Sequence, residues 1–508
     1  MAVATTFSRA EIGIEAPPVT VEADVIGGLP QIQIVGLPET AVKESKDRVK
    51  SAIKNANFDI PDRKLTVNLA PADLPKSGGR YDLSIALSIL AASNQIPAHR
   101  LVDMEFLGEL ALNGAIRPVT GVLPATIRAV KASNLIVVPR ANEHEAALAQ
   151  SNNVLVADSL LEVVHHLTGQ QRLETARKGA IAEQGITDQR LCDIRGQESA
   201  KRALTVAAAG AHNVIFVGPP GTGKTMLASR LPSLLPPMTL EESLMVASVR
   251  SVSKYSFEFT TWSKRPFRAP HHTSSAVALV GGSNPPRPGE ISLAHNGVLF
   301  LDELPEFTRH VLEVLREPLE SGKIVISRAS RQVEYPAQFQ LVAAMNPCPC
   351  GYFGDDSDRC NCTNDKIQRY RGRVSGPLLD RIDLHVEVPP LPTGALSDPA
   401  LRQDTDEHDR SINLIAEARL RMMHRSNKLN AHMSARLVES ACKLALADRN
   451  LLDSAMTKLG LSARGYYKIL KVARTIADLE GSEHIRTVHL TEALGYRRLD
   501  RSGHRSVL

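Results

Sequence analysis

The stretch NVIFVGPPGTGKTMLASRL, Asn213 to Leu231, decides the fold of the central part of this 508-residue chain. Its apolar run, Val214 to Val217, is typical of a buried strand, and a helical pattern follows the glycines. Between them the residues have the spacing G-x-x-x-x-G-K-T, in which glycines without a Cβ atom let backbone N–H groups wrap a phosphate chain. The following helix turns its N-terminus toward the anion. The stretch therefore predicts a phosphate-binding loop (P-loop) in a parallel α/β sheet.

The side chains of this loop match the groups of a nucleoside triphosphate. Lys224 neutralises the β and γ oxygens, and Thr225 offers a hydroxyl to Mg²⁺. Downstream, the apolar run GVLFLDEL ends in Asp302 and Glu303, where the first carboxylate can reach Mg²⁺ and the second can polarise an attacking water. We expect ATP and Mg²⁺ as cofactors, with Thr225 and Asp302 beside the metal. The predicted nucleotide-binding residues of these two motifs are Gly218, Pro219, Pro220, Gly221, Thr222, Gly223, Lys224, Thr225 and Asp302.

Two further polar residues adjoin apolar strand patterns. Asn346 ends FQLVAAMN, where its amide can hold the water or the γ-phosphate; the alternative is an asparagine that caps the next turn. Arg381 lies between two carboxylates in GPLLDRIDLHVEV, and the alternative there is a salt-bridged surface residue. In a ring-shaped ATPase such an arginine reaches the γ-phosphate of the neighbouring subunit and adds about 10³ to 10⁵ in rate.

Length and composition indicate a multidomain α/β protein. A single hydrophobic core stops growing at roughly 250 to 300 residues, so 508 residues predict about three domains. The 43% apolar and 23% charged residues exclude a largely disordered chain. Alternating strand and helix patterns predict an α/β domain over 1–168, a polar linker over 169–190 and a second α/β domain over 191–392. A linker over 393–410 and an all-helical domain over 411–499 follow.

Net charge and targeting signals bear on partners and location. The net charge of +5 fits a nucleic-acid partner but is also common in proteins that never bind one. The first residues lack a basic segment followed by an apolar core, and no run of about 18 apolar residues occurs. We therefore expect a cytoplasmic protein without a membrane partner.

Four of the six cysteines stand in one short segment, NPCPCGYFGDDSDRCNC. Cys348, Cys350, Cys360 and Cys362 form two C-x-C pairs around a glycine-rich, acidic stretch that is poor material for a hydrophobic core. Four thiolates at such spacing can surround a tetrahedral, structural Zn²⁺, which would supply folding energy to the loop. Free thiols in a loop and a redox pair are the alternatives.

GPPGTGKT, VLFLDE, Asn346 and LLDRIDL together resemble the core of the AAA+ ATPases. DIRGQESAKRAL resembles the segment that packs against adenine in that superfamily, which implies that Ile194 and Gly196 contact the nucleotide. Residues 265–307 are similar to the magnesium-chelatase-like branch. This similarity implies an insert in the second helix, near residues 265–293, and a β-hairpin before the sensor strand, over 321–336.

The resemblance also implies roles for individual residues. Glu303 activates the water, Asn346 senses the γ-phosphate, and Arg381 acts on the neighbouring subunit. Arg464, in LSARGYYKIL, matches the sensor-2 arginine of a helical lid; the alternative is an exposed helix arginine without a ligand. The predicted catalytic residues are therefore Glu303, Asn346, Arg381 and Arg464.

The N-terminal part resembles the Lon protease domain. PKSGGRYDL from Pro75 and GELALNGAIRPVTGVLPA from Gly108 carry this likeness. Arg80 stands where Lon has its nucleophilic serine, and Leu123 stands where it has the catalytic lysine. A Ser-Lys dyad needs both groups, so we expect the fold without peptide hydrolysis.

A Lon-like domain, a chelatase-like AAA+ core and a helical lid together resemble the ComM (YifB) family across essentially the whole chain. The resemblance implies a homo-oligomer, a hexameric ring, and a helicase that drives branch migration on single-stranded or branched DNA in natural transformation and recombination. The alternative function is a chelatase-type ATPase chaperone that remodels a protein partner without DNA.

The insert and the hairpin are where DNA would bind in such a ring. Cationic loops hold backbone phosphates without reading sequence. The alternative is ordinary surface charge on a solvated hairpin. His271 and His272, in PHHT, are interpreted as phosphate or DNA contacts or as packing. The predicted DNA contacts are Arg265, Arg268, Lys323, Arg328 and Arg331.

Overall fold

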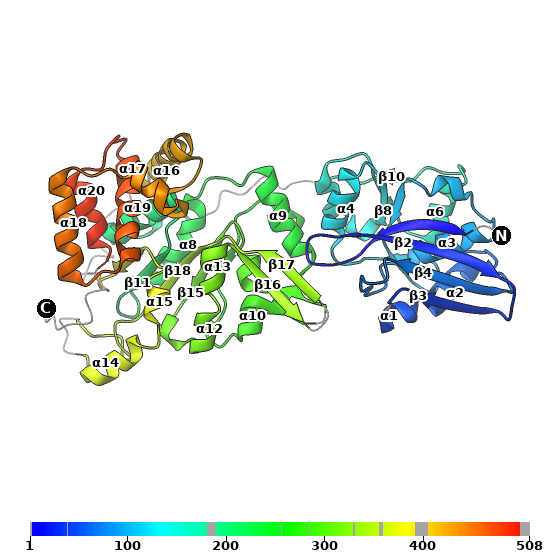
Figure 1. The fold of residues 1–508 in the computed structure, drawn as a ribbon, viewed down its shortest axis with the longest axis horizontal. Coiled ribbons are helices and arrows are strands. Elements are labelled where there is room, and N and C mark those ends of the chain that lie inside the picture. The colour runs from blue at the N-terminus through cyan, green and yellow to red at the C-terminus, as the bar shows by residue number, and fades with distance from the viewer. Residues whose placement is uncertain are drawn as a thin grey trace.

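The computed structural model describes residues 3–37, 39–179, 189–255, 257–283, 285–328, 331–354, 359–391 and 405–497. These residues form an N-terminal α/β domain, a central α/β domain and a helical C-terminal region, with the central domain between the other two (Figure 1). Within these ranges no helix is long and apolar enough to cross a membrane. The α/β and helical character predicted from the sequence is confirmed.

The N-terminal domain is built on an eight-stranded mixed sheet in the order β10-β9-β8-β5-β1-β2-β4-β3. Helix α3 (Asp82–Ala92) packs on β1 and β2, and all its residues are buried, as its nearly continuous apolar sequence requires. β10 pairs with β9, so the sheet extends into the segment predicted as a linker, 169–190. The strands are β1 (Ala4–Arg9), β2 (Pro18–Ile26), β3 (Gln31–Val35), β4 (Lys64–Ala70), β5 (Met104–Phe106), β8 (Leu135–Pro139), β9 (Val154–Ala157) and β10 (Glu174–Thr175).

The central domain has a five-stranded sheet in the order β12-β15-β18-β11-β19, and all its strand pairs are parallel. Parallel strands are covered on both faces, which explains the apolar runs VIFV and VLFL. Their carboxyl ends share one edge of the sheet, and the P-loop lies there. The strands are β11 (Val214–Val217), β12 (Phe267–Arg268), β15 (Val298–Leu301), β18 (Gln340–Met345) and β19 (Leu384–Glu387).

The segment predicted as an insert, 265–293, contains a strand of the central sheet. β12 lies in this segment and pairs with β15, so the insert is shorter than predicted. A short β13–β14 hairpin between two small helices makes up the rest. These elements are α10 (Ala276–Val280), β13 (Gly281–Gly282), β14 (Arg287–Pro288) and α11 (Glu290–Leu293).

The hairpin predicted over 321–336 is present as β16 (Lys323–Arg328) paired with β17 (Arg331–Pro336). It packs against the β1–β2 loop of the N-terminal domain, residues 10–17, through Ile12 and Ile14. A second contact joins α4 (Val122–Lys131) to α9 (Leu240–Ser251) of the central domain. Figure 1 shows α9 and the hairpin on the side of the central domain that faces the N-terminal domain.

The helical region packs on helix α7 (Glu198–Gly210) of the central domain through α16 and α19. Its first helix begins at Glu407, inside the segment predicted as a linker, 393–410. Helix α19 shows the strongest amphipathic pattern, with its apolar face in the core shared with the central domain. The helices are α16 (Glu407–Ser426), α17 (Ala435–Ala441), α18 (Leu446–Leu459), α19 (Ala463–Leu479) and α20 (Thr487–Gly495).

Candidate nucleotide site and metal centre

The P-loop joins β11 to helix α8 (Lys224–Leu234). Gly221 and Gly223 have φ values of +80° and +87°, a region in which side chains are strained, so glycine is required at these turns. The helix begins at Lys224, and its first N–H groups therefore face the loop. The predicted strand, turn and helix of an anion site are confirmed.

Lys224 is held by three neutral oxygen atoms. Its ammonium donates to the carbonyl oxygens of Gly218 and Pro219, both at 2.7 Å, and to Asn346 Oδ1 at 3.1 Å. Burial lowers the pKa of Lys224, while the carboxylates of Asp302 and Glu303 act in the opposite direction. A phosphate chain would offer anionic acceptors, with which an ammonium makes stronger hydrogen bonds. The structure thus brings the P-loop lysine and the predicted sensor amide together.

The two predicted magnesium ligands also meet. Thr225 Oγ1 donates to Asp302 Oδ2 at 2.8 Å, across the gap between α8 and the end of β15. A hydroxyl and a carboxylate oxygen are ligands that Mg²⁺ prefers. The predicted cofactor therefore fits the residues present.

Glu303 has an unusual backbone and an unforeseen partner. Its φ and ψ of 51° and 47° lie in the left-handed region, which non-glycine residues visit mainly at turns and functional sites. Its carboxylate Oε2 lies 3.1 Å from Nδ1 of His272. Sequence reasoning assigned His272 to phosphate, DNA or packing and missed this contact. One signal for this contact was available: His272 follows shortly after β12, and β12 pairs with β15, the strand that leads to Glu303.

Ile194 and Gly196 lie in the segment before α7. Ile194 is 5% exposed, and Gly196 has φ +61°. The next residue, Gln197, donates to the carbonyl oxygen of Pro389 at 2.7 Å, so the segment lies beside the carboxyl end of β19. This is the edge of the sheet that carries the P-loop, and the predicted adenine contact stays a prediction.

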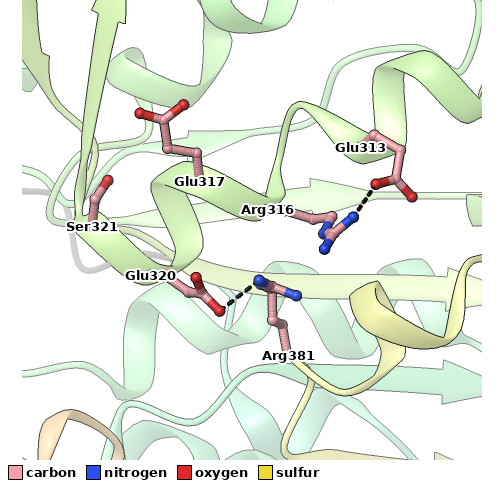
Figure 2. A pocket seen from close by; sticks show the side chains of 6 residues that line it. All are labelled: Glu313, Arg316, Glu317, Glu320, Ser321 and Arg381. Carbon is pink, nitrogen blue, oxygen red and sulfur yellow. Dashed lines mark hydrogen bonds and ion pairs between the residues drawn. The ribbon is translucent and has the colours of Figure 1, made fainter.

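Arg381 lies at the opposite edge, just before β19. A strand of four residues spans about 13 Å, so Arg381 is remote from the P-loop of its own chain. Its guanidinium pairs with Glu320 at 2.5 Å and donates to the Pro377 carbonyl at 2.7 Å. Figure 2 shows it in a pocket of about 340 Å³ lined by Glu313, Arg316, Glu317, Glu320, Ser321 and Arg381.

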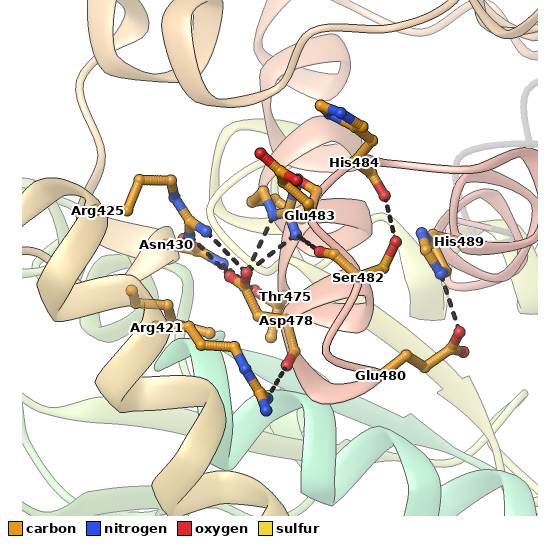
Figure 3. Close-up of polar contacts among 12 residues, drawn as sticks. Arg421, Arg425, Asn430, Thr475, Asp478, Glu480, Ser482, Glu483, His484 and His489 are labelled. Atoms are coloured by element: carbon orange, nitrogen blue, oxygen red, sulfur yellow. Dashed lines mark hydrogen bonds and ion pairs between the residues drawn. The ribbon is translucent and has the colours of Figure 1, made fainter.

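Arg464 is exposed in the first turn of α19 and has no ion pair among the described residues. The far end of that helix is locked by a polar cluster centred on the buried carboxylate of Asp478 (Figure 3). Arg425 donates to both its oxygens at 2.7 Å, and Asn430 donates to one of them at 2.9 Å. The buried Arg474 pairs with the same carboxylate at 3.0 Å. The helix that carries Arg464 is therefore rigidly anchored.

A buried polar chain, absent from the sequence predictions, joins α19 to the central sheet. Lys468 pairs with Asp383 at 2.6 Å, and Asp383 lies 3.2 Å from Nδ1 of His212. The other ring nitrogen of His212 lies 2.8 Å from Thr475 Oγ1. Although burial acts to raise it, Lys468 and His212 hold the pKa of Asp383 well below its usual range. Asp383 lies two residues after Arg381, so the chain ties the helical region to the segment that carries Arg381.

The four cysteines converge. Their sulfur atoms all lie within 4.8 Å of one another, and Cys348 is fully buried. Cys360 Sγ lies 3.8 Å from Cys348 Sγ and 3.7 Å from Cys350 Sγ, close to the separation of about 3.8 Å that a tetrahedral Zn²⁺ with Zn–S bonds of about 2.3 Å requires. A hydrogen bond from the Tyr352 backbone and the neighbouring thiols lower the pKa of Cys350 to about 6. The donor set fits a zinc ion.

The predicted DNA contacts are placed unequally. Arg265 donates to the Pro236 and Asn296 carbonyls at 2.7 Å each, and both oxygens of Glu290 accept from Arg268 at 2.6 and 2.8 Å. These two arginines thus serve the packing of the central domain. Lys323 is half exposed on the hairpin and pairs with Glu334 at 3.0 Å. The side chains of Arg328 and Arg331, at the hairpin tip, lie outside the described part of the structure.

The two positions singled out by the Lon resemblance lie close together. Arg80 pairs with Glu11 at 3.3 Å and donates to the Gly121 carbonyl at 3.4 Å, two residues before Leu123. Leu123 is fully buried in an apolar cluster with Leu148 of its own domain and Ala247 of α9. These two positions hold neither a serine nor a lysine, and α9 of the central domain packs over them.

Three family models match the chain in succession. Residues 190–396 match the model described as magnesium chelatase, subunit ChlI, and residues 409–497 match that of its C-terminal part. Residues 21–142 match a model described as subunit ChlI of Mg-chelatase. These matches agree with the AAA+ reading of the central domain and with the helical C-terminal region.

Similar proteins extend over the whole length. The chain is 51% identical to competence protein ComM of Haemophilus influenzae over 505 residues, which covers 99% of this chain and 98% of the relative. It is 47% identical to the uncharacterized protein YifB of Escherichia coli over 501 residues, again 99% and 98%. It is 29% identical to the magnesium-chelatase 38 kDa subunit of Rhodobacter capsulatus over 329 residues, 60% of this chain and 86% of the relative.

Proposed function

The chain belongs to the ComM/YifB family, and from this premise we propose that it is an ATP-hydrolysing AAA+ ring motor that moves on DNA and migrates branched junctions. The observation that carries the ATPase is the meeting of Lys224, Asn346 and the Thr225–Asp302 pair at the carboxyl ends of three neighbouring parallel strands. Ligands of open α/β sheets bind at this edge. Bound Mg²⁺ would neutralise charge on the phosphates, held by Thr225 and Asp302.

Side chains of this protein would carry out the other steps of ATP binding and hydrolysis. Lys224 would bind the phosphates, Glu303 would accept a proton from the attacking water once freed from His272, and Asn346 would orient that water. Arg381 would act on a neighbouring subunit's nucleotide once released from Glu320, and its distance from the P-loop of its own chain supports a ring. Arg464 would complete the site from the helical region.

DNA as the substrate rests on different support. A relative 51% identical is named a competence protein, and a role of this chain in natural transformation follows as a proposal. The hairpin β16–β17 carries Lys323 together with Arg328 and Arg331, and we place the DNA phosphates there. A motor with this substrate works in the cytoplasm.

The decisive experiment is ATP hydrolysis by the purified full chain with single-stranded, duplex and four-way-junction DNA, with Lys224→Ala as the blank. We expect branched or single-stranded DNA to stimulate hydrolysis and added salt to weaken the effect, because phosphate contacts release counterions. Strand-displacement assays then test junction migration. A rate of hydrolysis that is the same with and without every DNA would contradict the proposed DNA motor but not the proposed ATPase.

A second candidate function is an ATPase chaperone that remodels a protein partner. The observation that favours it is the internal pairing of Arg265 and Arg268, which engages two of the five predicted DNA contacts within the central domain. All three matching family models describe a magnesium-chelatase subunit. Indifference to DNA in the assay above would select this function.

We further propose that Cys348, Cys350, Cys360 and Cys362 hold one structural zinc. Four sulfur donors within 4.8 Å of one another support it: two pairs lie at 3.7 and 3.8 Å, and Cys348 and Cys350 are closer, at 3.3 Å. The donor set leaves no open ligand position, so the ion would stabilise the loop and take no part in catalysis.

A further inference from the structure

The loop closed by the four cysteines, residues 348–362, lies against the P-loop. Gly351 has φ +91°, and a Cβ atom placed on it would lie 2.5 Å from Cδ and 2.7 Å from Cγ of Pro220. Pro220 is the third residue of the P-loop motif. The Gly351 backbone therefore packs against the Pro220 ring with no space for a further atom between them.

The start of the same loop positions the predicted sensor. Cys348 comes two residues after Asn346, whose amide oxygen accepts from Lys224 at 3.1 Å. A displacement of Cys348 is therefore transmitted through one intervening residue to the group that holds the P-loop lysine.

The end of the loop returns to the same strand. Helix α14 (Asn364–Arg371) begins just after Cys362, and its Arg371 Nε donates to the Pro347 carbonyl at 3.0 Å. Its Tyr370 is buried and is hydrogen-bonded to the backbone of Asn346. The loop therefore adjoins residues 346–347 at its start and is hydrogen-bonded to them through the helix that follows its end.

Besides the sulfurs, contacts at the surface hold the described part of this loop: the Arg359 guanidinium lies 4.3 Å from the centre of the Tyr352 ring, and that of Arg371 lies 5.4 Å from the centre of the Phe353 ring. Gly351 and Cys348 are its buried members among the described residues, while Phe353, Gly354 and Arg359 are exposed. A segment without an apolar core takes its folding energy from the ion that its ligands share.

Resting on the zinc site proposed above, we propose that metal occupancy of the four-cysteine site controls ATP binding. The metal keeps Gly351 against Pro220 and Asn346 beside Lys224. Without it the P-loop loses this support and binds nucleotide weakly. The ATPase thereby becomes responsive to the supply of zinc.

The first test measures metal and nucleotide on the full chain. Zinc is quantified by mass spectrometry, and the Kd of a fluorescent ATP analogue is measured in excess Mg²⁺ before and after a zinc-selective chelator and after Zn²⁺ is restored. We expect one zinc per chain and an increase in Kd on the order of ten-fold without zinc, as when a charge-assisted hydrogen bond is lost, with recovery on reloading. Cys442→Ala, which alters a buried cysteine of the helical region, should leave zinc and Kd unchanged.

A matched pair of glycines tests the contact while all four cysteines remain. Gly351→Ala and Gly354→Ala introduce the same methyl group at φ values of +91° and +81°, but no atom of the described residues lies within 4 Å of the position at Gly354. Both variants should bind one zinc. Only Gly351→Ala should raise the Kd for ATP by about ten-fold, because its methyl group must displace Pro220.

The outcomes separate the proposals. A zinc-loaded chain that does not bind ATP overturns the proposed ATPase together with this control. Absence of zinc from the purified chain overturns the proposed metal site and the proposed control of ATP binding by the metal. The proposed ATPase activity is then unaffected. Zinc removal without a change in Kd, or equal Kd values for the two glycine variants, overturns only the proposal that the metal controls ATP binding.

Discussion

His295 follows α11 and is 6% exposed, with Nδ1 accepting the backbone N–H of Gln338 at 3.1 Å. Burial lowers its pKa from 6.5 to about 4, although Glu242 acts in the opposite direction. Between these values the folded chain keeps the ring neutral while the unfolded chain binds a proton. Its contribution to stability is therefore complete above pH 6.5 and is lost as the pH falls to about 4.

This histidine should make the central domain acid-sensitive. Lowering the pH from 7 to 5 should remove about 2 kcal/mol of the free energy of unfolding through His295. Urea unfolding of the wild type and of His295→Asn, which keeps an acceptor near the Nδ1 position, measures the difference. The variant should lose less stability over this pH range, whatever its stability at pH 7. Equal losses would show that the native ring is protonated normally.

Among elements, the β16–β17 hairpin differs most from its expected setting. Sequence resemblance directs it into the channel of a ring, yet within one chain its apolar face packs on the β1–β2 loop. A Cβ atom on Gly13 would lie 2.6 Å from Val333, and Ile12 and Ile14 join the core that includes Ile326. On the insert side, Tyr335 donates to the Pro286 carbonyl at 2.9 Å. The hairpin therefore links the insert to the N-terminal domain.

Replacing both isoleucines should loosen the hairpin. Ile12→Ser with Ile14→Ser removes two partly buried apolar side chains, a loss of about 1 to 3 kcal/mol at this contact. Hydrogen exchange should become faster for the amides of β16 and β17 and stay unchanged for β11. Ile26→Ser, an exposed position on β2, is the control. Unaltered exchange in the hairpin would mean that the N-terminal loop contributes nothing to its stability.

At the scale of the whole molecule, the P-loop and Arg381 lie at opposite edges of one sheet. One chain cannot bring them together, so the proposed hydrolysis requires a second copy. The N-terminal domain adds a further constraint, since α4 packs on α9 and Gly121 N–H donates to the Ser251 carbonyl at 2.9 Å. The surface around Gly121 and Leu123 thus attaches the N-terminal domain to the central domain.

Complementation between two inactive variants tests the division of labour. Arg381→Ala should bind ATP yet hydrolyse it about 10³-fold more slowly or worse. Lys224→Ala should fail to bind ATP but keep Arg381. Mixing the two should restore part of the activity, because the intact arginine of one chain serves the intact P-loop of the other. Normal turnover by Arg381→Ala alone, or no recovery on mixing, would contradict a role in trans.

Local spacing was enough to predict the groups whose chemistry depends on a few neighbouring residues. The P-loop, the Asp302–Glu303 strand end, the position of Asn346 and the paired cysteines were all readable, because each is set by a few consecutive residues and the strand or helix beside them. The helical C-terminal region was equally clear from its apolar spacing. Domain boundaries were less so: β10 and the start of α16 fall in segments that are polar enough to read as linkers.

The contacts between residues far apart in the chain could be seen in the folded molecule but not in the sequence. Local pattern carries no information on contacts between residues hundreds of positions apart, since these depend on how sheets and helices pack. The pairing of Glu303 with His272, the chain from Lys468 to His212, and the internal use of Arg265 and Arg268 are of this kind. So is the contact of Gly351 with Pro220, where two glycine-containing loops that follow neighbouring parallel strands converge at the edge of the sheet that carries the P-loop.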